Sequence, residues 1–355
     1  MGYEISQIRP GEAAELKRLA CPNFSVVERL FMSKPKLGLV ARADDGSYAG
    51  GAFLVVTEAG GRRVGCIDII FVLPEHRGSG AARLLNHAAV EELHNRGCTT
   101  VMALVRGDNS QSLRRFEAEG VLPVSLRQLR RRISTAAIAE LFIKTASLAC
   151  ATGCWILCEG AVSHIGDSGQ NLLRVAAVNG FMLLCGALFG AAFKTSSYPW
   201  WNMLAALLLL CVLTLGETLG RAFAGGRWHY VMPEGGLVPA AVVALLGGFY
   251  PMAGHWYLTE RENSVLYRRR MAAPASVSWL LLLAATGLSS VLYNTNSLFP
   301  AVSELGSMLL LLYALPFYPF DSFAARRVRE YSAVCYGVLA VLSLVTLATV
   351  TWWIA

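Results

Sequence analysis

Charged side chains are scarce in this chain of 355 residues: only 15% of them are Asp, Glu, Lys or Arg, whereas 55% are apolar. A soluble globular protein carries about 25% charged residues. The deficit is local, because residues 1–135 contain 19 Lys/Arg and 14 Asp/Glu and the remaining 220 contain only 12 and 10. The composition therefore excludes a single soluble domain. It predicts a soluble domain at residues 1–133 followed by a membrane domain at residues 134–355.

The sequence also lacks features that mark other classes of protein. Its first 35 residues contain no sustained apolar run, so no signal peptide is expected. Its nine cysteines are spread over both parts, which is not the pattern of a disulfide framework. The net charge of +7 comes largely from arginine clusters at 127–132, 268–270 and 326–329, each beside a hydrophobic run. Such clusters are typical of cytoplasmic membrane anchors, so no nucleic-acid partner is expected.

Long apolar runs are abundant after residue 135. A run of about 20 residues suffices to cross the ~30 Å hydrocarbon core of a bilayer. Seven spans are predicted, at residues 136–158, 171–193, 201–222, 237–258, 274–293, 300–320 and 332–354. With the N-terminal domain cytoplasmic, the arginine clusters all fall on the inner side, as the positive-inside rule requires. The sequence thus predicts a multi-pass integral membrane protein in contact with lipids, in the inner membrane if the source is bacterial.

The soluble part alternates between helical and extended patterns. Predicted helices are Glu12–Ala20, Phe24–Met32, Ala81–Arg96 and one opened by Asn109; predicted strands are Leu37–Arg42, Ala49–Thr57, Val64–Val72 and Thr99–Val105, with Val121–Arg131 as a final strand or two. This order predicts an α/β domain in which helices flank a mixed, twisted sheet. We expect that domain to be fused to an all-α membrane domain of about seven transmembrane helices.

The run from Val72 to Ala82 (VLPEHRGSGAA) carries the strongest local signal. A strand ends at a proline, two closely spaced glycines follow, and a helix begins. Several backbone N–H groups then converge at the positive end of a helix dipole, which favours a pyrophosphate. Glycine permits close approach of a ligand to the backbone. A plain turn is the alternative for this pattern.

Two motifs in this part resemble the GNAT acetyltransferase superfamily. Arg77, Gly80 and Ala82 match its Arg/Gln-x-x-Gly-x-Gly/Ala signature, after a strand and before a helix. The segment from Asn109 to Gly120 matches a second motif, with Phe116 seven residues after the asparagine. The resemblance covers the first ~130 residues and implies that acetyl-CoA or another acyl-CoA is the co-substrate. The residues that it places in contact with the acyl-CoA are Val72, Arg77, Gly78, Ser79, Gly80, Ala81, Ala82, Asn109 and Phe116.

Acyl transfer to an amine needs a base for the amine and an acid for the leaving thiolate. Asp68 is the candidate general base, because it lies nine residues before Arg77, on a strand where many members of the family carry Glu or Asp. The alternative for Asp68 is an ion pair with a neighbouring strand. Phe116 occupies the position of the tyrosine that protonates the thiolate in many members, and a phenyl ring donates no proton. Either another group serves, or the thiolate leaves unassisted, or the domain is impaired.

A second resemblance concerns the membrane part. The segment around Glu217 (LGETLGRAFA) resembles the zinc motif of site-2 proteases, but Gly216 and Gly220 stand where that family has histidines. A later Leu-Pro-x-x-Pro-x-Asp segment resembles another motif of the family, in which Asp321 matches the third zinc ligand. Glycine offers no metal-binding atom, so neither a metal nor peptide hydrolysis is expected.

Glu217 and Asp321 remain as two carboxylates at membrane depth, and such groups are costly and usually functional or ion-paired. An ion pair of Glu217 with Arg221, four residues later on the same helix, is the alternative. Three cysteines of the first predicted span are spaced four residues apart: Cys150, Cys154 and Cys158. Helix packing is favoured over a soft-metal site as their role.

Together the two parts predict a membrane-bound N-acyltransferase. It would move an acyl group from acetyl-CoA or another acyl-CoA to an amine on a lipid, a peptide or a membrane protein. The alternative from another class is a regulatory membrane protein that senses acyl-CoA without turnover and carries a non-catalytic, protease-like membrane domain. A third alternative is an active protease with unusual metal ligands.

Overall fold

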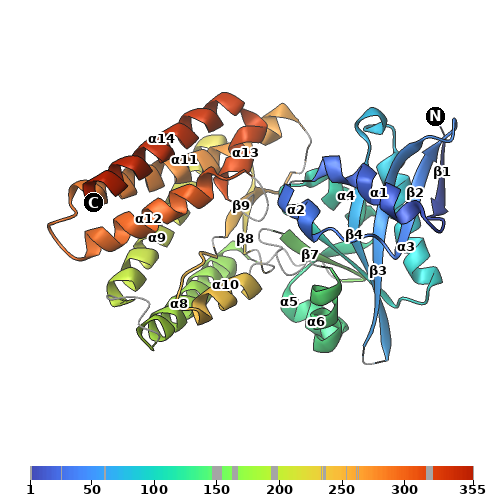
Figure 1. Ribbon diagram of the computed structural model, residues 1–355, viewed down its shortest axis with the longest axis horizontal. Coiled ribbons are helices and arrows are strands. Elements are labelled where there is room, and N and C mark those ends of the chain that lie inside the picture. The colour runs from blue at the N-terminus through green and yellow to red at the C-terminus, as the bar shows by residue number, and fades with distance from the viewer. Residues whose placement is uncertain are drawn as a thin grey trace. The chain divides into compact units, whose positions relative to one another are not determined.

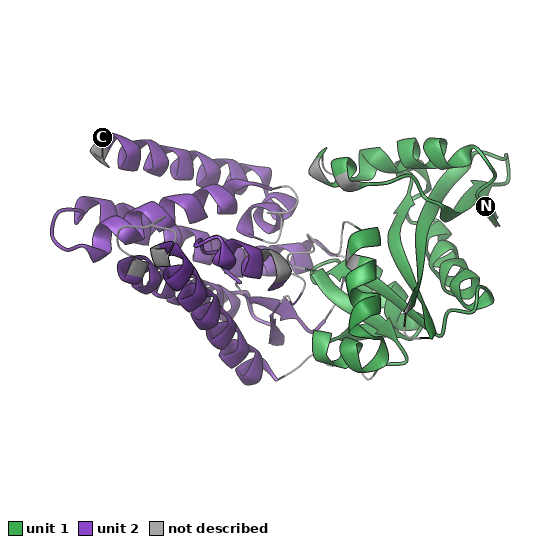
Figure 2. Ribbon diagram, turned by 60° about the horizontal axis from the view of Figure 1, so that its bottom comes forward, with its two compact units in different colours: residues 1–165 green, residues 166–355 purple. Residues whose placement is uncertain are grey.

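The structure is a computed structural model and describes residues 2–24, 26–59, 61–145, 154–161, 167–192, 199–232, 234, 237–252, 254–260, 262, 264–316 and 323–354. The chain divides into two compact units, Met1–Ile165 (unit 1) and Gly166–Ala355 (unit 2), which Figure 2 colours separately. Unit 1 is longer than the predicted soluble domain of residues 1–133, because the chain after residue 133 adds a helix and a strand to it.

Unit 1 is built on one seven-stranded mixed sheet with the order β1-β2-β3-β4-β5-β7-β6. Only β4 and β5 pair in parallel, and every other neighbouring pair is antiparallel. Its strands, most of them labelled in Figure 1, are β1 (Tyr3–Gln7), β2 (Leu37–Ala43), β3 (Tyr48–Ala59), β4 (Arg62–Val72), β5 (Thr100–Arg106), β6 (Val121–Val124) and β7 (Cys154–Glu159). The predicted mixed sheet with flanking helices is confirmed. The prediction missed β1, whose sequence is mostly polar, and β7.

Helices cover both faces of this sheet. On one face lies α3 (Ala81–Asn95), so close that a Cβ added at Gly65 would lie 2.8 Å from Leu93. The next residue of β4, Cys66, points to the opposite face. There it shares a hydrophobic core with α5 (Leu126–Arg132) and α6 (Thr135–Lys144). The remaining helices of unit 1 are α1 (Glu12–Ala20), η1 (Cys21–Asn23), α2 (Val26–Phe31), η2 (Pro74–His76) and α4 (Ser110–Ala118).

The first predicted span, residues 136–158, is wrong. Its beginning forms α6, and its end forms β7, which lies between β5 and β6 and pairs with both. Trp155, Ile156, Leu157 and Cys158 are all buried. An inner strand covered on both faces has a continuous apolar sequence, and such a run is indistinguishable from part of a span by hydropathy. The expected helical face of cysteines is therefore absent here; Cys150 lies outside the described residues.

Unit 2 is predominantly helical. Its helices are α8 (Ser168–Ala192), α9 (Pro199–Ala224), α10 (Leu237–Leu245), α11 (Val265–Val291), α12 (Leu298–Ala314), α13 (Ala324–Tyr331) and α14 (Ala333–Ile354). The central helix is α11, which packs against α9, α12, α13 and α14. At its middle Trp279 is completely buried, and its indole N–H donates to Ser343 Oγ on α14 (2.9 Å). The predicted helical membrane domain is thus built around one long helix.

Four described helices are long and apolar enough to cross a membrane, namely those that begin at Ser168, Trp200, Val265 and Ala333. The seven predicted spans are not confirmed. The run 237–258 forms only the nine-residue α10 and the strand β9 (His255–Leu258), which pairs with β8 (Trp228–Val231). The run 300–320 overlaps α12, which has 17 residues.

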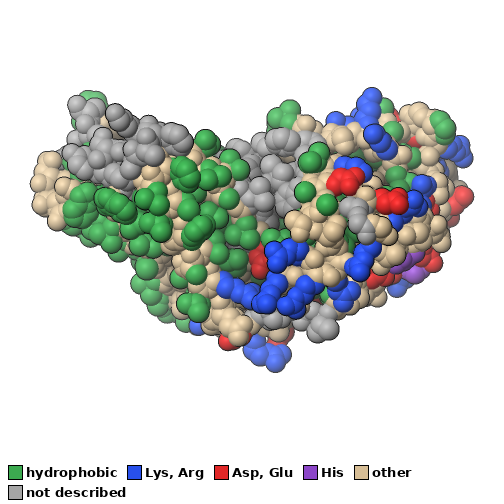
Figure 3. Space-filling model, turned by 90° about the horizontal axis from the view of Figure 1, so that it is seen from below, with side chains coloured by type: hydrophobic (Ala, Val, Ile, Leu, Met, Phe, Trp, Pro, Cys, Tyr) green, Lys and Arg blue, Asp and Glu red, His purple; other side chains and the backbone are tan. Residues whose placement is uncertain are grey.

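The outer surface of unit 2 is apolar. Leu173 and Phe181 on α8, and Val334 and Val338 on α14, are each more than half exposed. Figure 3 shows apolar side chains over much of the outer face of this unit and Lys and Arg side chains mainly elsewhere. Large contiguous apolar surfaces are rare on soluble proteins. Together with the four long helices, this surface indicates a membrane protein.

Candidate active site

The pairing of β4 with β5 ends before β4 does. The parallel ladder has its last pair at Ile67 and Ala103, whereas β4 continues to Val72. The Leu73 N–H donates to the Ala49 carbonyl on β3 (2.9 Å). Successive backbone N–H groups of a strand point to opposite sides, so the Val72 N–H points away from β3, to the side on which β5 no longer pairs. Among the described strands, none pairs with residues 69–72 of β4 on that side, and we call these residues the free edge of β4.

The free edge leads directly into the glycine loop. After the single turn of η2, Gly78 and Gly80 have φ of 83° and 94°, a left-handed conformation that favours glycine. Gly80 is the N-cap residue of α3 and has no side chain with which to accept the first amides of the helix. Those amides, which include Ala81 and Ala82, have no acceptor within the helix. They are available to an anion at the positive end of the helix dipole.

Two side chains of the loop hold it in place. The Arg77 guanidinium donates to Asn23 Oδ1 (2.6 Å), which ties the loop to η1. The Ser79 hydroxyl donates to the His76 carbonyl (2.5 Å) and closes the turn. The loop itself is exposed from Arg77 to Gly80. Of the six residues that the sequence assigns to the pyrophosphate, 77–82, the first four are exposed, whereas Ala81 is buried and Ala82 is partly exposed.

Asp68 lies directly before the free edge, in a β-bulge of β4. Phe53 pairs with Ile69 and Leu54 with Ile67, so Asp68 is the extra residue of the bulge. Bulges redirect a side chain relative to regular strand geometry. Burial, with the nearby Asp68 charge as a second cause, raises the pKa of the Cys66 thiol well above its usual value. The carboxylate thus lies near Cys66, partly exposed, at the end of the parallel ladder.

The two predicted contacts on α4 serve its local structure. Asn109 is the N-cap of the helix, and its side chain accepts from the Ser112 N–H (3.1 Å). Phe116, in the last turn of the helix, is buried. The Asn86 amide of α3 donates to the Arg115 carbonyl (3.2 Å), which links the two helices. The second motif therefore positions α4 against the helix that begins at the glycine loop.

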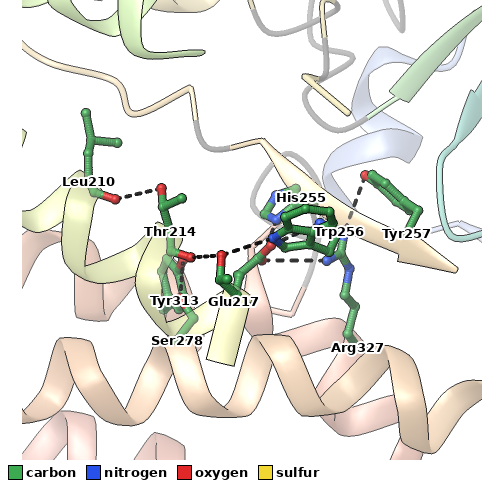
Figure 4. Close-up of polar contacts among 10 residues, drawn as sticks. Leu210, Thr214, Glu217, His255, Trp256, Tyr257, Ser278, Tyr313 and Arg327 are labelled. Atoms are coloured by element: carbon green, nitrogen blue, oxygen red, sulfur yellow. Dashed lines mark hydrogen bonds and ion pairs between the residues drawn. The ribbon is translucent and has the colours of Figure 1, made fainter. Parts of the chain in front are cut away.

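A buried polar cluster lies in unit 2 (Figure 4). Oε1 of Glu217, on α9, lies 2.6 Å from Nδ1 of His255 and 3.9 Å from the guanidinium of Arg327 on α13. The other carboxylate oxygen accepts from the Trp256 N–H (3.1 Å). Arg327 also donates to the Tyr257 hydroxyl (3.3 Å). Each of these side chains is more than 90% buried.

The positive charge of Arg327 lies 3.9 Å from the Glu217 carboxylate and balances its negative charge. No group of three His, Cys, Asp or Glu side chains that could hold a metal is found in the described part of the chain. Asp321, the other predicted carboxylate, lies outside the described residues. Sequence reasoning missed His255 and Arg327 as partners of Glu217, because the first follows no spacing rule and the second belongs to a cluster that resembles a membrane anchor.

Gly216 and Gly220, at the positions of the missing histidines, make close contacts between helices. A Cβ added at Gly216 would lie 2.4 Å from the Cα of Ser278, and one added at Gly220 would lie 2.5 Å from the Cα of Pro274. Ser278 and Pro274 both belong to α11. A small-xxx-small pattern that lets two helices approach is common between membrane helices. The two glycines therefore have a packing role of their own.

The predicted ion pair between Glu217 and Arg221 is wrong. Arg221 instead stacks on Trp256, with its guanidinium carbon 3.5 Å from the ring centroid. Within the described part of unit 2, the partners of the Glu217 carboxylate come from β9 and α13. This cation–π contact holds Arg221 near the cluster, while the Glu217 carboxylate binds its other partners.

Part of this chain resembles known proteins. Solved structures that resemble it include a chain of the NatC complex bound to Gag peptide and CoA (19% identity, 46% of this chain and 100% of that one, TM-score 0.33). Others are an IAA acetyltransferase from Bacillus cereus (22%, 35% and 79%, 0.29) and N-acetylglutamate synthase from Neisseria gonorrhoeae complexed with coenzyme A and N-acetyl-glutamate (15%, 45% and 35%, 0.32). A search of curated proteins gave no match.

The family model of the acetyltransferase (GNAT) family matches residues 12–120. This range contains the free edge of β4, the glycine loop and α4, so both motifs of the sequence resemblance fall inside it. The N-terminal part of this chain therefore carries a GNAT acetyltransferase domain, which supports an acyl-CoA-dependent N-acyltransferase.

Proposed function

We propose that the protein is a membrane-bound enzyme that transfers an acyl group from acetyl-CoA, or another acyl-CoA, to an amine presented at the cytoplasmic face of a membrane. The observation that carries this proposal is the free edge of β4, which ends in the glycine loop. A thioester placed along that edge has Asp68 at one end and the amides of residues 77–82 at the other. Acyl-CoA is long enough to contact both.

In this proposal the loop binds the pyrophosphate. The N–H groups of Gly78, Gly80, Ala81 and Ala82 point at the anion from the start of α3, where the helix dipole adds a partial positive charge. Arg77, held by Asn23, contributes a full positive charge beside it. Ser79 keeps the turn closed. Asn109 and Phe116 lie on the helix that packs beside α3 and would border the pantetheine.

The reaction then follows from the free edge. The neutral amine of the acceptor attacks the thioester carbonyl carbon, a C–N bond forms, and the C–S bond breaks. The Val72 N–H, which points away from β3, polarises the thioester carbonyl. Asp68 takes the proton of the amine, directly or through a water molecule. The coenzyme A thiolate leaves without help from Phe116, because its ring has no proton to give.

Binding and turnover of acetyl-CoA test this proposal directly. Detergent-solubilised protein should bind acetyl-CoA in calorimetry, and Arg77→Glu should weaken that binding by at least about tenfold, because it reverses a charge beside the pyrophosphate. Arg18→Glu, an exposed reversal on α1, is the matched control and should bind normally. Radiolabelled acetyl groups should pass to an amine in membrane extracts. Protein that neither binds acetyl-CoA nor labels any extract component would exclude the proposal.

The buried ring of Phe116 favours one second candidate, a sensor that binds acyl-CoA without turnover. Phe116→Tyr distinguishes the two, because it restores a group able to protonate the thiolate. An enzyme should keep or gain rate with the tyrosine. A sensor should show no loss of thioester over hours in either form, and Asp68→Asn should not change its binding.

The acceptor is an amine on a lipid, a peptide or a membrane protein. Support comes from the fusion of the GNAT domain to helices long enough to cross a membrane. Lipids and proteins of cells with and without the protein should differ by the mass of one acyl group on a particular amine. The same comparison with Arg77→Glu should show a smaller difference, because that variant binds the acyl donor more weakly.

A further inference from the structure

An arginine surface lies on unit 1, at the helix α5 (Figure 1). The sequence of this helix is LRQLRRR, and its Leu129 is buried in the core that also holds Ile133. A capping box between Ser125 and Gln128 fixes its first turn. With one face fixed in the core, the helix directs three arginines to solvent. We call Arg127, Arg130 and Arg131 the arginine surface, and all three are exposed.

No contact within the described part of the protein accounts for these three charges. None of them belongs to an ion pair or side-chain hydrogen bond there. By contrast, Arg132 donates to the Glu159 carbonyl (3.0 Å), and Arg62 donates to the Arg132 carbonyl. Like charges three and four residues apart on a helix repel one another. The arginine surface therefore destabilises the isolated fold, and a negatively charged partner would compensate the repulsion between the arginines.

The short linker between this core and α8 indicates which negatively charged surface lies nearby. Ala161 is buried in the same core as Leu129, and the apolar helix α8 begins at Ser168, only seven residues later. Seven residues reach at most ~25 Å when fully extended. The arginine surface adjoins the exit of the chain, because Arg132 holds the carbonyls of Glu159 and Gly160. If α8 enters a bilayer, unit 1 cannot leave the headgroup region.

We infer that the arginine surface docks unit 1 onto the anionic phospholipid headgroups of the membrane that holds unit 2. Guanidinium groups bind phosphate through paired hydrogen bonds, and clusters of arginine beside a membrane helix attract anionic lipid. Docking would keep the glycine loop close to the membrane that presents the acceptor amine. The inference rests on the membrane insertion of α8 and is independent of turnover.

Hydrogen–deuterium exchange of the full-length protein in lipid nanodiscs tests the docking. Amides of residues 126–133 should exchange at least about fivefold more slowly in discs with 30% phosphatidylglycerol than in discs of phosphatidylcholine alone. The triple variant Arg127→Gln, Arg130→Gln, Arg131→Gln should lose that difference. Its melting temperature should not fall, because none of the three side chains has a partner in the described fold. Salt at 0.5 M should weaken the difference in the original protein.

A matched control removes three other exposed positive charges of unit 1, at Arg9, Lys34 and Lys36. That variant should keep the full difference between the two kinds of disc. Equal exchange in both kinds of disc would overturn the inference. So would protection that appears in neutral discs only when RNA or an acidic protein is added, since the arginine surface would then have a different partner. Acetyl-CoA binding, measured in the same discs, should be unchanged in both variants, so failure of docking is distinguishable from failure of the proposed activity.

Discussion

The carboxylate of Glu217 lies 2.6 Å from Nδ1 of His255, and both side chains are more than nine-tenths buried in unit 2. Removing one member of a buried, hydrogen-bonded pair leaves the other charge or dipole without compensation. The usual cost is about 3–5 kcal/mol. The pair therefore fixes the strand β9 to the helix α9, although these two elements are far apart in the sequence.

Glu217→Gln and His255→Ala should each lower the thermal stability of the detergent-solubilised protein strongly. Arg227→Gln, which breaks the exposed pair with Glu260 in the same unit, is the control and should cost about 0–1 kcal/mol. Thermal unfolding followed by tryptophan fluorescence gives both values. Equal melting temperatures for the two kinds of variant would contradict the structural importance of the buried pair.

Gly216→Ala should destabilise unit 2, because its new Cβ would lie 2.4 Å from the Cα of Ser278 and would push α9 away from α11. Overpacking of this kind costs about 1–3 kcal/mol. Gly287→Ala is the matched control: it lies on α11 with no atom within 4 Å of the added Cβ, so it should be neutral or slightly stabilising. The same thermal unfolding experiment compares them, and a Gly216→Ala protein as stable as the control would show that the helices are not in close contact.

Asp68→Asn should lower kcat by about 10²–10⁴-fold, the usual contribution of a general base, while the Kd for acetyl-CoA stays unchanged. The amide keeps the shape of the side chain in the β-bulge but takes up no proton. Steady-state rates with a labelled amine and calorimetric titration with acetyl-CoA separate the two effects. Unaltered kcat would assign Asp68 to the structure of the bulge alone.

The thiol of Cys158 should react slowly with alkylating reagents. Burial, as the largest cause, raises its pKa to about 11. Two units above the ordinary value of 9.0 mean roughly 100-fold less thiolate at pH 8, and only the thiolate reacts. Mass spectrometry after treatment with iodoacetamide should find Cys158 unmodified in the native protein and modified after unfolding in SDS. Rapid native labelling would mean that β7 opens readily.

His87 should titrate at higher pH than an ordinary histidine, because its hydrogen bond with Glu119 raises its pKa in the folded state. A raised folded pKa gives stability that is fully present below the unfolded value near 6.5 and is lost as pH rises through the folded pKa. Glu119→Gln should bring the pKa back toward 6.5 and remove that pH dependence. NMR titration of the His87 ring measures the shift directly, and an identical midpoint in the variant would refute the assignment.

Local signals predicted the local structure of unit 1. The helix Glu12–Ala20 has the bounds that its pattern predicts, and the loop at 74–80 lies between β4 and α3 as expected. Both depend on neighbours within a few residues, such as the positive φ of Gly80. Seven of the nine acyl-CoA contacts proposed from the sequence lie between Val72 and Ala82, at the end of β4, in the loop and at the start of α3, because they are nearly consecutive, whereas Asn109 and Phe116 belong to α4.

Features that depend on distant pairing were not predictable in this way. The run Trp155–Cys158 is apolar because it lies between two strands and is buried on both faces of the sheet. A hydropathy pattern cannot distinguish that environment from lipid. Likewise, His255 meets Glu217 only through the antiparallel pairing of β8 and β9 and the packing around them. Gly216 shows the converse: its contact with α11 explains the residue without reference to a lost metal site.

The position of β7 determines how unit 1 would resist tension on the chain that follows it. The chain leaves unit 1 from a strand with a partner on each side, so tension along the linker acts on two antiparallel ladders in shear rather than peeling an edge strand. Arg132, which holds the carbonyls of Glu159 and Gly160, clamps the point at which the force enters. A fragment that stops at residue 133 would lose this strand and leave β5 and β6 with bare edges. The sheet of unit 1 is complete only when residues 154–159 are part of it.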